Sequence, residues 1–123
     1  MSDATGQPRM EPYSRHMIVC TGRFCSPEGK GRALYARLAE LLEREDLLFG
    51  PGRVKRSEAP CLGVCEGGPV AVVYPEGLWY GHVDLALLQR IVREHLRHGR
   101  PIDAHVFHRL GSEPPNEPPA STG

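Results

Sequence analysis

The chain has 123 residues, with 15 basic and 15 acidic side chains and a formal net charge of zero. This length favours a single domain. A neutral chain whose one basic run, residues 53–56, is only four residues long shows no electrostatic sign of nucleic-acid binding. No apolar stretch approaches the roughly 18 residues of a membrane-spanning helix, and no secretory segment is visible at the start. We expect a cytoplasmic protein that binds neither nucleic acid nor membrane.

The two ends of the chain differ in composition from its middle. Residues 1–12 are polar, and residues 111–123 are rich in proline with almost nothing apolar. Such segments bury too little surface to offset the entropy of ordering them. We therefore predict two disordered tails, 1–12 and 111–123, around one folded domain at 13–110, which is long enough to bury a core.

The first half of this domain predicts a strand followed by a helix. Residues 16–20 (HMIVC) are a short apolar run that indicates a buried strand. Residues 26–46 carry leucines at helical spacing, with Ser26 suited to capping and Pro27 to the first helical position. The sequence FGPG at 49–52 ends this helix.

The second half predicts three more strands and a closing helix. Residues 53–59 alternate weakly, 70–75 are β-branched, and 78–80 follow a glycine turn at 76–77. An apolar stripe predicts a helix over 83–98, with Asp84 at its start. This order predicts an α/β fold in which a small mixed sheet is packed with two main helices.

All four cysteines lie in two short segments next to predicted strands. Cys20 and Cys25 form C-x4-C, and Cys61 and Cys65 form C-x3-C. Loops at strand ends can meet at one end of a compact sheet, which would bring four thiols together. In a reducing compartment such a pattern indicates metal binding or catalysis more than a disulfide framework.

Four thiols with these spacings could serve three purposes, and the three do not fit equally well. A dithiol oxidoreductase uses C-x-x-C at a helix start, which is absent. Structural zinc stays open, although its usual knuckles are C-x2-C. A [2Fe–2S] cluster fits best because it takes four thiolates and tolerates wider loops. Backbone amides can stabilise its negative charge, and glycines let the chain approach closely enough to offer them. The loop glycines are Gly22, Gly63, Gly67 and Gly68.

Other motifs carry less weight. None of the six histidines lies inside a cysteine loop, which argues against a Rieske centre. Two H-x-x-H pairs between His95 and His108 fit ordinary helix and surface residues, and Trp79 and Tyr80 fit the core. The sequence has no catalytic set and no nucleotide-binding glycine motif. We expect an electron carrier without enzymatic activity.

The segments CTGRFC at 20–25 and CLGVCEGGPVAVVYPEGLWY at 61–80 resemble the thioredoxin-like [2Fe–2S] ferredoxins, the Shethna protein I type. They are also similar to the small [2Fe–2S] subunit of NADH dehydrogenases and bidirectional hydrogenases. The resemblance covers residues 14–100. It implies a thioredoxin-like fold, a first ligand pair Cys20 and Cys25, a second pair Cys61 and Cys65, and often a homodimer.

The expected function is therefore one-electron transfer between redox enzymes, a reductase and an acceptor. Two alternatives stay open, a zinc-stapled interaction module and an electron-transfer subunit of a larger NADH-linked dehydrogenase or hydrogenase. Residues 102–110 (IDAHVFHRL) and the proline-rich tail have no counterpart in the resemblance.

Overall fold

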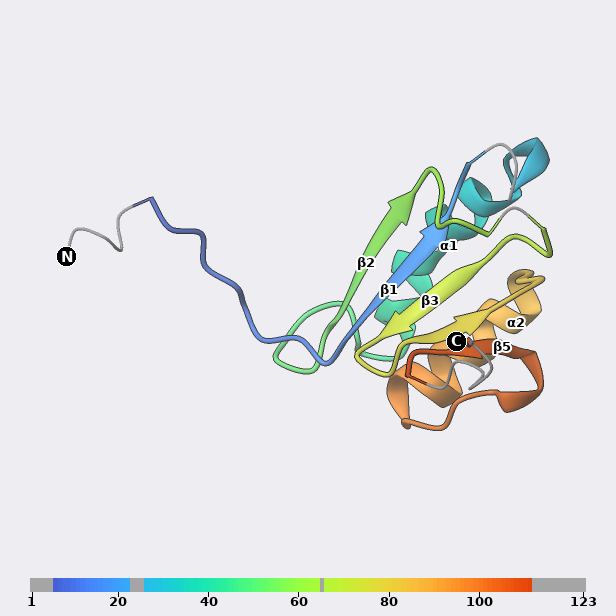
Figure 1. Cartoon of the computed structure of the whole chain (residues 1–123). Coiled ribbons are helices and arrows are strands. Elements are labelled where there is room, and N and C mark those ends of the chain that lie inside the picture. The colour runs from blue at the N-terminus through green and yellow to red at the C-terminus, as the bar shows by residue number, and fades with distance from the viewer. Residues whose placement is uncertain (1–5, 23–25, 65, 112–123) are drawn as a thin grey trace, which may run out of the picture.

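A computed structural model describes residues 6–22, 26–64 and 66–111 (Figure 1). In this part of the chain five strands form one mixed sheet in the order β2-β1-β3-β4-β5, with β1 and β2 parallel and the other neighbours antiparallel. The strands are β1 (Arg15–Cys20), β2 (Val54–Ala59), β3 (Ala71–Tyr74), β4 (Leu78–Tyr80) and β5 (Val106–Arg109). The four strands expected from the sequence are confirmed.

Strand β5 was not predicted. It is four residues long, and it pairs with β4 across an irregularity between Trp79 and Tyr80. Its sequence, VFHR, has no continuous apolar run, because the strand lies at the edge of the sheet and is only half-covered. Short edge strands of this kind carry little pattern of their own and depend on the neighbour to which they pair.

Helix α1 (Lys30–Arg44) begins three residues later than predicted. A short 3-10 turn, η2 (Pro27–Gly29), precedes it, and Glu28 and Gly29 both have positive φ, 63° and 74°. That backbone conformation interrupts a continuous helix from Ser26. Ser26 nevertheless satisfies the first turn, since its hydroxyl oxygen accepts a hydrogen bond from the amide of Gly31.

The second helix begins as predicted and then changes type. Asp84 caps α2 (Leu85–Arg90), because its Oδ1 accepts from the amide of Leu87 at 2.8 Å. The chain continues directly as a π-helical segment, η3 (Ile91–Arg97). A final 3-10 turn, η4 (Asp103–His105), then leads into β5.

Both helices cover the same face of the sheet (Figure 1), so the protein has two layers. Met17 and Val19 of β1 and Val73 of β3 point into the core against the leucines of α1 and α2. Because side chains alternate along a strand, Ile18 and Cys20 belong to the opposite face. None of the helices in the described ranges has the length and apolarity needed to cross a membrane.

A polar network lies inside this core. Tyr80 and His95 are both fully buried, and the Tyr80 hydroxyl lies 2.9 Å from Nδ1 of His95. The amide of Ile102 donates to the same hydroxyl at 3.1 Å. Since the hydroxyl proton is then directed to Nδ1, the ring proton belongs on Nε2, which faces a carboxylate oxygen of Glu76 at 3.5 Å. The expectation that Tyr80 is a core residue is confirmed.

The predicted tails lie largely outside the described residues. Residues 1–5 and 112–123 are not described, so disorder there stays a prediction. Residues 7–13 have no regular secondary structure and are exposed. The first and last strands of the sheet in chain order are β1 (Arg15–Cys20) and β5 (Val106–Arg109), and the domain boundaries stay a prediction.

Candidate metal centre

The two cysteine segments start from neighbouring strands. Cys20, the last residue of β1, pairs in parallel register with Ala59, the last residue of β2. The amide of Thr21 donates to the carbonyl oxygen of Ala59 at 2.8 Å, which joins the two chains just beyond the strands. Cys61 follows two residues later. Both loops therefore leave the same end of the sheet (Figure 1).

The two loops come very close together at Gly22 and Pro60. A Cβ atom placed on Gly22 would lie 1.7 Å from the carbonyl oxygen of Pro60 and 2.8 Å from its carbonyl carbon. Both neighbours are backbone atoms, so no side chain can turn away to make room. Only glycine fits here. The sequence assigned Gly22 to a close approach to the cluster, whereas the structure places the backbone of Pro60 against it.

Cys20 is buried at the place where the two loops meet. Its side chain has no exposed surface, and it packs with Val70 in a small cluster on the sheet face opposite the helices. Leu62, Val64 and Trp79 pack against this pair. The amide of Cys20 donates to the carbonyl oxygen of Val70 at 2.9 Å. Leu62 and Val64 belong to the second cysteine segment, so the first predicted ligand already contacts the loop of the second pair.

Cys61 lies on the outside of the same junction. It is exposed, and its thiol is free. The amide of Gly63 donates to its Sγ at 3.3 Å, with Gly63 at a positive φ of 82°. An amide directed at a cysteine sulfur is what a thiolate ligand requires, because it stabilises the negative charge on sulfur. The predicted role of Gly63 is consistent with this contact.

The other predicted ligands, Cys25 and Cys65, lie outside the described residues. Their place in the ligand set therefore stays a prediction, and metal binding through Cys20 uses its reduced thiolate.

A second glycine brings helix α1 against the first cysteine segment. A Cβ on Gly31 would lie 2.2 Å from the carbonyl oxygen of Cys20. Ser26 is 2% exposed, and its amide donates to the carbonyl oxygen of Gly22 at 3.0 Å. Together with the Ser26–Gly31 hydrogen bond, this fixes the start of α1 beside Cys20. Sequence reasoning assigned Ser26 only to capping and missed this second role.

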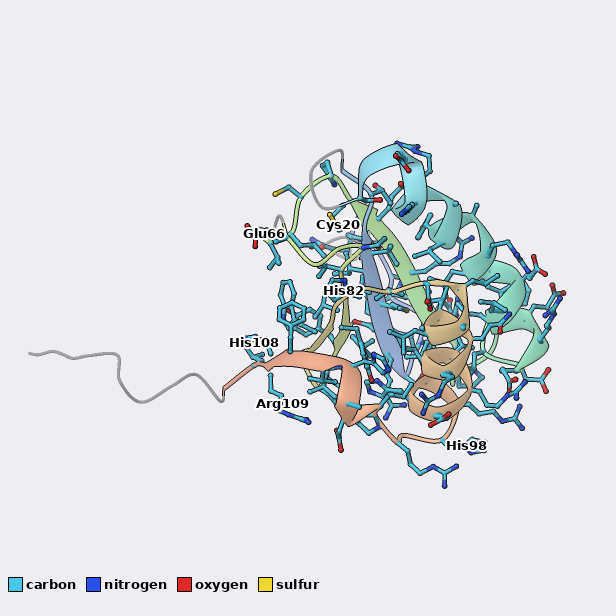
Figure 2. All side chains as sticks on the ribbon, turned by 90° about the vertical axis from the view of Figure 1, so that its right-hand side faces the viewer. Cys20, Glu66, His82, His98, His108 and Arg109 are labelled. Atoms are coloured by element: carbon cyan, nitrogen blue, oxygen red, sulfur yellow. The ribbon has the colours of Figure 1, made fainter. Side chains whose placement is uncertain are left out.

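The second cysteine segment is fixed at its far end by the turn before α2. The amide of His82 donates to the carbonyl oxygen of Gly67 at 2.6 Å, and that of Val83 donates to Pro69 at 3.0 Å. Gly67 and His82 both have positive φ, 75° and 48°. Figure 2 shows Cys20, Glu66 and His82 gathered at one end of the molecule. No sequence signal predicted that residues 81–83 support this loop.

A hollow of about 600 Å³ opens beside the first loop and the end of β2. Its charged lining is mixed, with Glu28 and Glu58 of one sign and Arg32 of the other. The rest of the wall is formed by Thr21, Gly22, Ser26, Gly29 and Pro60. This side of the cysteine end therefore carries charges of both signs.

The histidine pairs do not form a second metal site in the part of the chain that the structure describes. No group of three or more His, Cys, Asp or Glu side chains there is placed to hold a metal ion. His95 is buried against Tyr80, and His98 is exposed.

The residues that are described fit a thiolate-ligated cluster. Two cysteine-bearing loops meet where Gly22 lies against Pro60. One thiol is buried among apolar side chains, and the other accepts a hydrogen bond from a backbone amide. Such an environment excludes water on one side and compensates sulfur charge with N–H groups on the other. The fold and this junction together define a two-layer α/β protein with a candidate cysteine metal centre at one end of its sheet.

Comparison with known proteins identifies the family. No family model matches the chain. A "Ferredoxin, 2Fe-2S" from Clostridium pasteurianum is 34% identical over 93 residues, covering 68% of this chain and 86% of the relative. A protein of the same description from Aquifex aeolicus is 32% identical over 101 residues, covering 76% of this chain and 88% of the relative.

Solved structures agree with these relatives. The thioredoxin-like [2Fe-2S] ferredoxin from Aquifex aeolicus superimposes with a TM-score of 0.69 at 29% identity, over 78% of this chain and 98% of that one. A second structure of this ferredoxin gives a TM-score of 0.67. The chain belongs to the thioredoxin-like [2Fe–2S] ferredoxin family. The predicted family and fold class are confirmed.

Proposed function

We propose that the protein is a [2Fe–2S] ferredoxin that carries single electrons between redox enzymes, with Cys20, Cys25, Cys61 and Cys65 as the cluster ligands. The observation that carries this proposal is the contact between the two cysteine loops at Gly22 and Pro60. Membership of a family of 2Fe-2S ferredoxins supports the cofactor and the role. The cluster, when bound, supplies a one-electron couple whose potential in all-cysteine ferredoxins is on the order of −400 mV.

The chain's own residues have distinct tasks in this proposal. Cys20 would hold the buried side of the centre, shielded from water by Val70 and Trp79. Cys61 would hold the exposed side, where Gly63 directs an amide at its sulfur. More donors to sulfur and more exposure generally raise the reduction potential. The reduction potential would therefore depend separately on the burial of Cys20 in one loop and on the amide contact to Cys61 in the other.

We also propose that the protein has no enzymatic activity, that it works in the cytoplasm and that it forms a homodimer. The first two follow from the carrier role and from the need for reduced thiols. The third rests on the family resemblance. Sedimentation equilibrium of the cluster-loaded protein tests the dimer, and a monomer at micromolar concentration would contradict it.

Metal and sulfide analysis of anaerobically purified protein tests the cofactor. We expect two irons and two acid-labile sulfides per chain, a red-brown colour, and a paramagnetic signal after reduction by one electron. Colourless protein with one zinc per chain would instead support a zinc-stapled interaction module. Binding to a flavin-containing NADH dehydrogenase subunit, with the same iron content, would assign the protein to such an assembly.

A further inference from the structure

An apolar surface leads away from the cysteine loops to the edge strand β5. Trp79 packs against the buried Cys20–Val70 pair on one side. On its other side it meets Phe107 edge to face, with ring centroids 6.4 Å apart and planes 68° apart. Phe107 is 50% exposed. Packed side chains therefore connect the buried cysteine to a ring in solvent.

A groove of about 320 Å³ lies between Phe107 and the second cysteine loop. Val64 and Gly67 form its wall on the loop side, and Val106 and Phe107 form its wall on β5. Gly81 lies between them, where an added Cβ would be 3.2 Å from the Phe107 ring. The missing side chains at two glycines thus create the groove and let the ring lie close to the backbone.

The side chains that line the groove favour binding of an apolar side chain over a charged one. Its only carboxylate is that of Glu66, and its other polar side chains are the imidazoles of His82 and His105. A charged side chain entering it would lose hydration without a set of partners to replace it. The hollow beside the first loop, by contrast, has acidic and basic side chains. The two sides of the cysteine end therefore differ in charge, and the groove beside Phe107 carries fewer charged side chains.

We propose that this groove is the docking site of the electron-transfer partner protein, which inserts one uncharged apolar side chain between Val64 and Phe107. The proposal rests on the proposed carrier function. The partner must approach the cluster loops closely, because electron transfer weakens steeply with distance. A small apolar contact with a polar rim suits the brief encounters of redox proteins, which bury less than about 1,200 Å².

The alternative occupant is a second copy of this chain. Phe107 of one copy would then fill the groove of the other and cover the apolar route from Cys20 on both. The observations favour a redox partner, because the groove is continuous with packing around a predicted ligand. The oligomeric state of the variants separates the two occupants.

The experiment compares Phe107→Ser with a matched control, Phe49→Ser. Phe49 is also an exposed phenylalanine, 75% accessible, but it precedes β2, whereas the cysteine loop follows that strand. It therefore lies at the other end of the sheet. Phe107→Leu serves as a conservative variant that keeps the groove apolar. All are used as cluster-loaded, full-length proteins.

Each reduced protein is mixed rapidly with ferric cytochrome c, a protein probe, or with hexaamminecobalt(III), a small probe. One electron passes to the haem iron or to cobalt, and no proton is transferred in forming the ferrous or cobaltous product. We expect Phe107→Ser to react about tenfold more slowly with cytochrome c, as for loss of an interface hot spot. Its rate with hexaamminecobalt(III) should be unchanged, and Phe107→Leu and Phe49→Ser should behave as the unmodified protein.

Three results would overturn the proposal. One is an unchanged cytochrome c rate in Phe107→Ser. Another is equal slowing with both probes, which would place the effect in the cluster and not in docking. The third is a change of molar mass in Phe107→Ser, which would make this surface a dimer interface. Failure to load iron and sulfide into the unmodified protein would contradict the proposed function instead, and it would be seen before any rate is measured.

Discussion

Gly22 and Pro60 come so close that the α-carbon of one faces the carbonyl oxygen of the other without room for a single methyl group. These residues are 38 positions apart in the chain, and each lies in a different cysteine segment. The contact holds the two loops in one place. It is therefore the position at which a minimal substitution should separate the loops.

Gly22→Ala is expected to prevent stable cluster binding. The new Cβ would overlap backbone atoms of Pro60, so the loops must move apart and the four thiols lose their common position. Iron and sulfide content and visible absorption measure the loss. Gly52→Ala is the matched control, since a Cβ there meets nothing within 4 Å. Full iron content in Gly22→Ala would contradict the role of this contact.

Serine substitution tests the ligand assignment at each cysteine. Cys20→Ser and Cys61→Ser should each weaken or abolish the visible spectrum, because a hydroxyl is a poor replacement for a thiolate on iron. The same is expected for Cys25 and Cys65. Thr21→Ser, next to Cys20, should leave the spectrum unchanged. An unaltered spectrum in any of the four cysteine variants would remove that residue from the ligand set.

The buried His95 predicts loss of stability in acid. Burial lowers the pKa of His95 from its ordinary 6.5, and Arg15 acts in the same direction, while Glu76 opposes them. Below about pH 6.5 the unfolded chain therefore binds the proton more readily than the folded one. Stability should be complete above pH 6.5 and decline as the pH falls, by at most about 1.4 kcal/mol per pH unit for this group.

Urea denaturation at several pH values between 5 and 8 measures this slope. His95→Gln should flatten it, whereas His98→Gln, at an exposed position of the same helix, should not. Burial and nearby Lys55 also lower the pKa of His16, so part of the slope will remain in His95→Gln. A slope identical in His95→Gln and in the unmodified protein would contradict the assignment.

The cap of α2 gives a prediction about local stability. Asp84→Ala removes the acceptor for the Leu87 amide and should destabilise the fold by about 1 kcal/mol. Asp103→Ala is the control, because its ion pair with Arg109 is on the surface and such pairs contribute little. Thermal unfolding of both variants compares them. If Asp84→Ala and Asp103→Ala melted at the same temperature, the Asp84 cap would contribute no more to stability than a surface ion pair.

The sequence alone determined the features that depend on neighbouring residues. Hydrophobic period and turn residues located four of the strands and both helices, and cysteine spacing with its flanking glycines indicated the cluster before any contact was known. The structure agrees on these elements, and the relatives agree on the family. Local patterns suffice here because propensity and burial act within a few residues of each other.

Contacts between segments far apart in the chain became known from the folded structure. In the folded chain Gly22 lies against Pro60, the amide of His82 donates to Gly67, and Phe107 packs beside Trp79. The structure also revealed β5 and the left-handed turn before α1, where the chain departs from its local preference. The physical reason is that strand pairing and loop packing take their free energy from partners far away in sequence, so the partner's position must be known before the contact can be predicted.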